Sequence, residues 1–279
     1  MAQTPQTPDH STEATSDGAD GSTPACGGGG PGPCAICGQG QDPGLDFTFA
    51  YQPIVDGLSG QVFAHEALVR GVAGEPAPSV LDRVVEANRY SFDQACRVRA
   101  IDLACDLGLP QRGGEKLSIN FLPHAVYRPE VCIQTTLQAA QRRGLDVSSI
   151  IFEVTEGERI EDGPWFAEIL REYRRQGFLT AIDDFGAGYA GLRLLSDFQP
   201  DLIKLDMDLV RHVDTLRPRQ AIARAVIRLA QDLGIRLVVE GVETVGERDF
   251  FLHEGVTLFQ GYLFSRPQFR GLASAPLRG

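Results

Sequence analysis

Seven consecutive apolar segments of this 279-residue chain carry polar side chains near their carboxyl ends. Each of these side chains is an acid, an amide or an amine. They are Glu66; Asn120; Glu153 and Glu156; Asp183 and Asp184; Lys204 and Asp206; Glu240 and Glu243; and Gln260. If the segments are strands of a barrel, their carboxyl ends share the face where barrel active sites lie. The spacing therefore predicts one shared site.

A simpler explanation applies to any single Asp or Asn after a strand, because these residues commonly cap helices or form turns. It does not suit Glu66 and Glu153, since Glu is a poor cap and both lie inside apolar runs. An unpaired carboxylate there would be costly, so such groups are usually paired or bind metal. Seven separate caps in consecutive segments are a weaker interpretation than one site.

The donor types at these positions favour hard divalent cations. Carboxylate and amide oxygens suit Mg²⁺ or Mn²⁺ rather than soft metals. The five histidines are scattered, and the chain has no HExxH or similar zinc pair. Four or five converging carboxylates would repel one another unless more than one cation bound. We therefore predict a two-cation site, which activates water for in-line displacement at phosphorus.

The glycine-rich stretch GAGYAG, residues 186–191, allows a different interpretation. It matches the dinucleotide pattern GxGxxG after a predicted strand, and Asp206 stands where a ribose-binding acid belongs. That interpretation is disfavoured because Asp183 and Asp184 would face the pyrophosphate with no cation between them. DFG, residues 184–186, also matches a kinase motif, but no HRD loop or VAIK strand accompanies it.

The elements that must position these residues are eight short apolar runs that alternate with helical patterns. The predicted strands cover 47–53, 61–68, 116–121, 150–156, 179–184, 202–206, 236–242 and 258–264, and the clearest helices cover 79–108, 167–177 and 219–234. Such alternation implies a largely parallel sheet. The short linker DGLSG makes the first two strands antiparallel, because a parallel pair needs a long crossover. We predict an α/β fold, a modified TIM (β/α)8 barrel with an antiparallel first strand; an open doubly wound sheet is the alternative.

Residues 1–45 have a different composition, rich in Pro, Gly, Ser, Thr and Asp. They offer too little apolar surface to offset the cost of ordering, so we predict a mostly disordered tail. The tail contains a cluster of three cysteines, Cys26, Cys34 and Cys37. Three thiols without a neighbouring histidine do not complete a zinc site, so plain thiols are favoured and a metal or redox role stays open.

Charge and hydropathy limit the class of protein. Five of the 37 acids lie in the tail, so 32 acids face all 26 basic residues in the remainder, and the net charge is −11. An acidic body disfavours DNA or RNA polymers as partners. No apolar run approaches the ~18–20 residues of a bilayer span, and the first twenty residues lack the features of a signal peptide. We expect a cytoplasmic protein with no membrane partner, a domain at 46–270 and a C-terminal tail at 271–279.

The ordered motifs of the domain resemble those of the EAL-domain cyclic di-GMP phosphodiesterases. They are YQPIVD, EALVR, SINF, FEVTE, DDFGAGY, IKLD, VVEGVE and QGYLFSRP, in that order. The resemblance implies a modified TIM barrel with an antiparallel first strand, and hydrolysis of the second messenger cyclic di-GMP to linear pGpG. Many members have Trp where this chain has Gly71, which resembles a subgroup with some members attached to light-sensing domains.

The resemblance also implies roles for single residues. The implied metal ligands are Glu66, Asn120, Glu153, Asp183 and Asp184, of which the two aspartates would share the two cations. The implied catalytic residues are Lys204, which would position or help deprotonate the attacking water, Glu240 as a further essential acid, Gln260 as a residue that orients the water, and Glu156, which would hold the loop after DDFG.

Substrate contacts are implied at three further residues. Arg70 matches a phosphate contact, which suits its forked donors. Gln52 and Leu68 are the other two expected contacts. For Gln52 and for Glu243, a hydrogen bond that merely supports the fold is the alternative.

The complete set of ligands favours an enzyme over the alternative, a non-hydrolysing cyclic di-GMP receptor. The expected cofactors are two divalent cations, Mg²⁺ or Mn²⁺, with Ca²⁺ expected to inhibit turnover while supporting binding. The expected ligand is cyclic di-GMP. A homodimer and a separate sensor or regulatory protein stay open as further partners.

Overall fold

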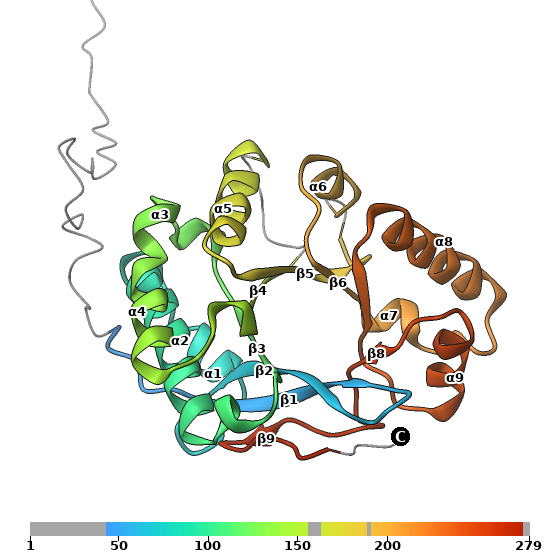
Figure 1. Cartoon of the computed structure of the whole chain (residues 1–279), viewed down its shortest axis with the longest axis horizontal. Coiled ribbons are helices and arrows are strands. Elements are labelled where there is room, and N and C mark those ends of the chain that lie inside the picture. The colour runs from blue at the N-terminus through green and yellow to red at the C-terminus, as the bar shows by residue number, and fades with distance from the viewer. Residues whose placement is uncertain (1–42, 156–162, 189–190, 276–279) are drawn as a thin grey trace, which may run out of the picture. The chain divides into compact units, whose positions relative to one another are not determined.

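A computed structural model describes residues 43–155, 163–188 and 191–275 (Figure 1). The predictions for the first 42 residues, including Cys26, Cys34 and Cys37, lie outside the described residues, and so does the prediction for Glu156. All statements below concern the described part of the chain.

Eight strands close into a barrel, as predicted. They are β1 (Thr48–Asp56), β2 (Val62–Arg70), β3 (Lys116–Asn120), β4 (Ile150–Thr155), β5 (Leu179–Phe185), β6 (Leu202–Leu205), β7 (Arg236–Val239) and β8 (Leu258–Phe259). Strands β2 to β8 pair in parallel in chain order, whereas β1 runs antiparallel to both β2 and β8 and so closes the ring. The closed ring confirms the modified TIM barrel and rules out the open doubly wound sheet. A two-residue strand that the sequence did not predict, β9 (Gln268–Phe269), pairs antiparallel with Ala50 and Tyr51 near the start of β1.

Helices pack around the barrel (Figure 1). They are α1 (Pro78–Leu81), α2 (Glu86–Asp106), α3 (Pro129–Cys132), α4 (Gln134–Arg143), α5 (Gly163–Arg175), α6 (Gly191–Asp197), α7 (Met207–Val210), α8 (Arg217–Leu233) and α9 (Val245–His253), with short 3₁₀ turns at Leu109–Gln111, Pro123–Ala125 and Val147–Ser149. The prediction of one continuous helix over 79–108 was wrong. Helix α1 ends at Leu81, and Val85 is extended and caps α2, with its N–H donating to Asn88 Oδ1 at 2.8 Å.

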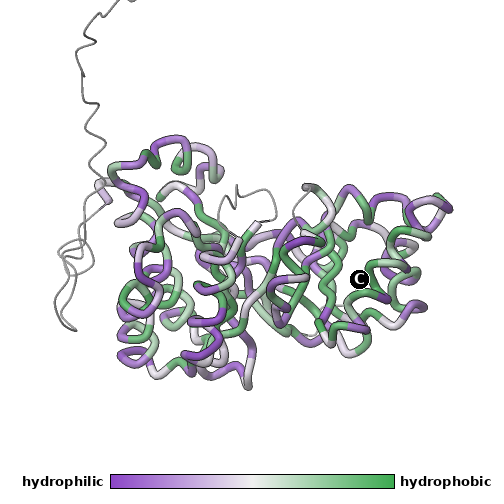
Figure 2. Tube along the Cα trace, turned by 90° about the horizontal axis from the view of Figure 1, so that it is seen from above, coloured by the Kyte–Doolittle hydropathy of each residue, from purple (hydrophilic) through white to green (hydrophobic). Residues whose placement is uncertain are grey.

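The barrel interior holds one apolar layer beneath a polar one. The apolar layer consists of Ile54, Ala64, Ile151, Ala181, Leu202, Val238 and Leu258. Since alternate residues of a strand face the same side, the residue two positions further along each parallel strand also points inward. For Ala181 that residue is Asp183, and for Leu202 it is Lys204. In the same way, Glu66, Glu153, Glu240 and Gln260 each lie two positions after a residue of the apolar layer. Because β1 runs in the opposite direction, its inward polar residue, Gln52, lies two positions before Ile54. Figure 2 shows hydrophobic residues along the inner strands and hydrophilic ones on many of the outer turns.

Residues on both sides of the expected 46–270 domain are packed against it. Leu45 is buried, and its carbonyl accepts a hydrogen bond from Arg99 at 3.2 Å. Leu272 and Ala273 are also buried, and the Ala273 carbonyl accepts from Arg112 at 2.6 Å. The packed body therefore includes these flanking residues.

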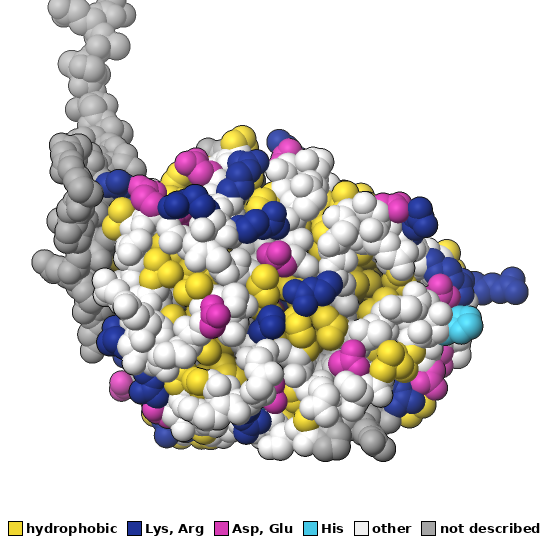
Figure 3. Space-filling view, viewed as in Figure 1, with side chains coloured by type: hydrophobic (Ala, Val, Ile, Leu, Met, Phe, Trp, Pro, Cys, Tyr) yellow, Lys and Arg dark blue, Asp and Glu magenta, His cyan; other side chains and the backbone are white. Residues whose placement is uncertain are grey.

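The surface carries charges of both signs. On the face shown in Figure 3, basic and acidic side chains are interspersed with hydrophobic ones. None of the described helices combines the length and apolar character that a bilayer crossing requires.

Candidate active site

Lys204 stands at the centre of the polar layer. Its side chain is 1% exposed, and Nζ contacts four carboxylates that β2, β4, β5 and the residue after β7 provide. The oxygens are Glu66 Oε2 at 3.1 Å, Glu153 Oε2 at 3.0 Å, Asp183 Oδ1 at 3.0 Å and Glu240 Oε1 at 2.9 Å. Strands far apart in the sequence thus place their carboxylates around one ammonium, which offsets the mutual repulsion of these acids.

Amide and hydroxyl groups orient the buried acids. Glu66 Oε1 accepts a hydrogen bond from Asn120 Nδ2 at 3.1 Å, and Glu66 Oε2 accepts from Gln260 Nε2 at 2.8 Å. Glu153 accepts from the hydroxyl of Ser118. The structure therefore brings Glu66, Asn120 and Gln260 into direct contact, as the shared-site prediction required.

Asp183 and Asp184 reach the site together because β5 is irregular at this point. Adjacent residues of a regular strand point to opposite faces. Here the pairing of β5 with β6 shifts between Ile182 and Phe185, and Asp184 has a positive φ of 53°. Asp is one of the few non-glycine residues that adopts this conformation readily. Its N–H donates to Asp183 Oδ1 at 3.0 Å, so the bulge fixes both side chains.

Glycines permit close packing on either side of the site. Gly186 has a φ of +101°, and a Cβ there would lie 2.4 Å from Leu209 Cδ1. At Gly261 a Cβ would lie 2.0 Å from the Val242 carbonyl oxygen. The close backbone approach at Gly261 keeps Gln260 beside the segment after β7, where Gln260 O accepts from the Val242 N–H at 3.1 Å.

Electrostatic coupling shifts the pKa values of the clustered groups. Burial raises the pKa of Glu153 to about 8 although Lys204 opposes the shift. Burial and the neighbouring Asp183 raise the pKa of Asp184 to about 6. Burial also raises the pKa of Glu240 well above its usual range. For Lys204, burial lowers the pKa, but Asp183 and the three glutamates outweigh it and raise the pKa well above the ordinary value. Burial thus favours the protonated forms of Glu153 and Glu240, whereas the surrounding acids keep Lys204 charged.

The donor set fits divalent cations. Two groups of acids bring ligand oxygens within 4.8 Å of one another: Glu66, Glu153 and Asp183, and Asp183, Asp184 and Glu240. Asp183 belongs to both. All these donors are hard oxygens. The buried Oε1 of Gln260 has no hydrogen-bond partner among the described residues, so it can accept from water at the site.

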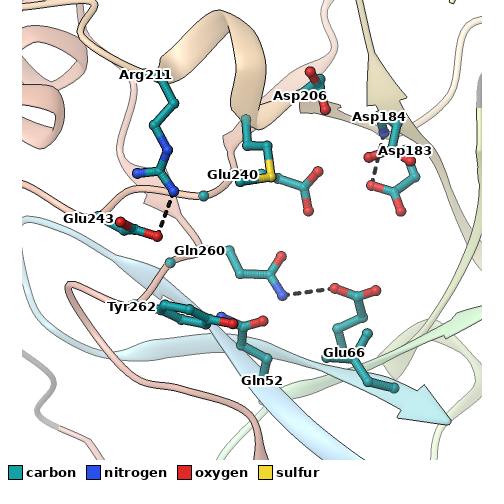
Figure 4. Close-up of a pocket in the computed structure, with 14 residues that line it drawn as sticks. Gln52, Glu66, Asp183, Asp184, Asp206, Arg211, Glu240, Glu243, Gln260 and Tyr262 are labelled. Carbon is teal, nitrogen blue, oxygen red and sulfur yellow. Dashed lines mark hydrogen bonds and ion pairs between the residues drawn. The ribbon is translucent and has the colours of Figure 1, made fainter. Parts of the chain in front are cut away.

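A cavity of about 310 Å³ opens above this cluster. Figure 4 shows Glu66, Gln260 and Gln52 on one side of it and Asp183, Asp184 and Glu240 on another, all directed toward the same space. The further lining residues are Leu68, Asp206, Met207, Arg211, Gly241, Glu243, Gly261 and Tyr262. The base of the cavity is therefore mostly acidic, whereas its rim carries acidic, basic and apolar side chains.

Two of the expected substrate contacts line this cavity and the third lies beside it. Gln52 is paired across the β1–β2 ladder with Glu66, and its Nε2 also donates to the Ser265 carbonyl at 3.3 Å. Leu68 lines both this cavity and a neighbouring apolar one of about 260 Å³. Arg70 lines only the neighbouring cavity, together with Asn120.

Sequence reasoning missed several residues. Ser118 could have been found, because it lies two positions before Asn120 and so shares its strand face. Arg211 pairs with Glu243 at 2.5 Å on the rim, and Tyr262 lies half-exposed beside them. The sequence gives no periodic signal for Arg211, which follows α7, or for Tyr262.

Comparisons with known proteins agree on one family. Residues 44–267 match the family model described as the EAL domain. The chain is 35% identical over 232 residues to the blue light- and temperature-regulated antirepressor BluF of Escherichia coli (strain K12). This match covers 83% of this chain and 57% of BluF. It is 31% identical over 230 residues to the cyclic di-GMP phosphodiesterase NbdA of Pseudomonas aeruginosa, covering 78% of this chain and 28% of NbdA. The chain thus spans little more than half of the first relative and less of the second.

Solved structures give the same result. A standalone versatile EAL protein from Vibrio cholerae O395, in its c-di-GMP bound form, is 50% identical with a TM-score of 0.79, and the match covers 83% of this chain and 96% of that one. A manganese/cy-diGMP complex of Klebsiella pneumoniae BlrP1 at pH 9.0 is 39% identical with a TM-score of 0.76, covering 83% and 58%.

Proposed function

Because the chain belongs to the EAL domain family, we propose that it hydrolyses cyclic di-GMP to linear pGpG with two divalent cations, Mg²⁺ or Mn²⁺. The observation that carries the proposal is the pair of acidic groups that share Asp183 at the base of a cavity. The cytoplasmic location expected from the sequence is part of the same proposal.

The residues that would hold the cations are the five ligands expected from the sequence, joined by Glu240, which was expected there as a further essential acid. One group would use Glu66, Glu153 and Asp183, with Asn120 beside Glu66. The other would use Asp183, Asp184 and Glu240. When bound, such cations lower the pKa of water and offset the charge on a phosphodiester.

Lys204 and Gln260 would orient the attacking water. The ammonium of Lys204 is held among four acids, so its position is fixed from several sides. Gln260 donates to Glu66 through Nε2, which leaves Oε1 to accept a hydrogen bond from water. Attack of water on phosphorus breaks the bond to the 3′ oxygen, which takes up a proton, and leaves pGpG with a 5′-phosphate.

The substrate would lie along the cavity and its apolar neighbour. Arg70, Leu68 and Asn120 line that neighbouring space, and Gln52 lines the main one. Arg70 has a planar fork that suits a phosphate. Extension over two adjacent cavities fits a ligand with two nucleotides.

A non-hydrolysing receptor is the second candidate. One observation favours it: BluF, a relative at 35% identity, is named an antirepressor. Such a chain would bind cyclic di-GMP and act on a partner without cleaving the ligand.

Product analysis separates the two candidates. The purified chain is incubated with cyclic di-GMP and Mg²⁺ or Mn²⁺, and nucleotides are followed by chromatography, with Glu66→Ala as the inactive control. We expect pGpG from the wild type only. Binding of cyclic di-GMP by folded protein without any pGpG under either metal would establish the receptor instead.

A further inference from the structure

A buried ion pair lies behind the active site and belongs to none of its acidic groups. Asp93 and Arg97 are one turn apart on α2, and both are almost completely buried, with side-chain exposures of 1% and 0%. Arg97 Nη2 lies 2.7 Å from Asp93 Oδ2, and Nη1 donates to the Tyr173 hydroxyl on α5 at 2.7 Å. The pair therefore ties α2 to α5 outside the barrel.

The same pair reaches the strand end that carries Asn120. The N–H of Leu122, two residues after Asn120, donates to Asp93 Oδ1 at 2.9 Å. Between them, the N–H of Phe121 donates to the Glu153 carbonyl at 3.1 Å. The backbone after Asn120 is thus held from β4 on one side and from α2 on the other.

Aromatic rings connect the guanidinium to both neighbouring strand ends. Arg97 Cζ lies 5.5 Å from the ring centroid of Phe121, 5.0 Å from Phe152 and 5.4 Å from Tyr173. Phe121 directly follows Asn120, and Phe152 directly precedes Glu153. Because neighbouring residues of a strand face opposite sides, the rings point outward to Arg97 while Glu153 points inward to the site.

Stability alone is a weak reason for such a pair. Removing two charges from water is costly, and replacing a buried ion pair with well-packed apolar side chains often leaves stability unchanged or raises it. Outer partners that orient ligand-bearing segments, in contrast, strongly affect metal affinity.

We propose that Asp93 is a positioning residue, oriented by Arg97, that fixes the backbone after β3 and so sets the place of Asn120 in the divalent-cation site. This inference rests on the proposed function. Asp93 is among the residues that line the apolar cavity of about 260 Å³, but its carboxylate oxygens contact Arg97 and the Leu122 N–H, so it acts through the backbone of Leu122.

Two double variants isolate the contact. Asp93→Leu/Arg97→Met removes both charges and also the acceptor for Leu122, whereas Asp93→Asn/Arg97→Met removes the charges but keeps an acceptor oxygen of similar reach. Binding of Mn²⁺ to metal-free full-length chain is measured by calorimetry without substrate, and the urea midpoint is measured in parallel. We expect Mn²⁺ binding in the Leu/Met variant to be about tenfold weaker than in the Asn/Met variant, which keeps the acceptor but loses the guanidinium that orients it and should bind severalfold more weakly than the wild type.

A conservative variant tests the positioning role even if the double variants misfold. Tyr173→Phe removes only the hydroxyl that accepts from Arg97, and we expect a smaller, severalfold loss of Mn²⁺ affinity. Ile227→Val on α8 is the control for a remote core change and should leave Mn²⁺ binding unaltered. Folded Leu/Met and Tyr173→Phe variants with wild-type Mn²⁺ affinity would overturn the positioning role.

Failure of the inference and failure of the proposed function are distinguishable. A wild type that binds Mn²⁺ and forms pGpG, with variants that bind Mn²⁺ equally well, refutes only the role of Asp93. A wild type that binds no Mn²⁺ refutes the cation site and the role of Asp93 with it.

Discussion

Lys204 Nζ on β6 lies 3.0 Å from Asp183 Oδ1 on β5, and Asp183 is the acid that both groups of candidate cation ligands share. The Lys204 ammonium and the Asp183 carboxylate thus lie where the two groups of acids meet. Lys204 stabilises the acids electrostatically, and Asp183 joins the two groups.

Replacement of Lys204 should abolish turnover and change the response to metal. In Lys204→Met the four acids lose the cation that they share, so the metal-free protein should unfold at a lower temperature. Turnover should fall by about 100-fold or more, the loss typical of removing one group that stabilises the transition state electrostatically. Added Mn²⁺ should raise the unfolding temperature by more than it does in the wild type. Lys116→Met, at the only other lysine, is the matched control; near-normal turnover in Lys204→Met would contradict the assignment.

Calcium should support ligand binding but not hydrolysis. Ca²⁺ accepts more oxygen ligands at longer distances, about 2.3–2.6 Å, than the near-octahedral Mg²⁺ at about 2.0–2.1 Å. The oxygen-rich cluster can therefore bind Ca²⁺ without holding water and phosphorus in the reactive arrangement. Calorimetry with cyclic di-GMP in Ca²⁺ should show binding, and chromatography of the same sample should show no pGpG. Turnover in Ca²⁺ at the Mg²⁺ rate would refute this prediction.

Arg70→Lys should weaken substrate binding more than it slows the chemical step. Arg70 ends β2 beside the apolar cavity, and Lys lacks the planar fork that binds two phosphate oxygens together. An interaction made equally in the ground and transition states changes KM and leaves kcat nearly constant. We expect KM to rise about tenfold, measured by steady-state kinetics, with Arg83→Lys as an exposed control. A fall in kcat at unchanged KM would place Arg70 in the chemical step.

Glu247 should stabilise the protein in a pH-dependent way. It lies in the first turn of α9 and forms a capping box with Thr244, and its carboxylate accepts from the backbone N–H groups of Glu243 at 3.0 Å and His212 at 3.2 Å. Burial raises the pKa of Glu247, but these backbone hydrogen bonds outweigh it, so the folded-state pKa lies below the ordinary value. This stabilisation is present above the unfolded pKa of about 4.3 and is lost as the pH falls through the folded pKa.

Two variants at this cap test the direction of the pH dependence. Glu247→Gln should lose about 1 kcal/mol at pH 7 by urea unfolding, and the loss should shrink below about pH 4. Thr244→Ala removes the uncharged half of the box and should lose a similar amount at both pH values. An equal loss for Glu247→Gln at both pH values would show that the charge of Glu247 makes no contribution.

The sequence by itself determined which residues share the inner face of the barrel. Alternation along a strand places Asp183 above Ala181 and Lys204 above Leu202, and the short DGLSG linker forces β1 to run antiparallel to β2. These features depend on residues a few positions apart, so local patterns suffice to predict them. The predicted strands and the shared inner face of Glu66, Glu153 and Asp183 follow from this local information, whereas the set of five metal ligands came from the resemblance to the EAL domains.

Only the tertiary structure decided how these residues meet. Gln260 and Glu66 are 194 positions apart, and their hydrogen bond exists because β1 closes the ring between β8 and β2. Asp184 points into the site because the pairing of β5 with β6 shifts in register, and the sequence of β5 alone does not predict this shift. The Arg211–Glu243 pair likewise joins segments after β6 and β7. Closure of the barrel sets these distances, because hydrogen bonding and packing across the whole ring, and not the neighbours in the chain, fix where each strand end lies.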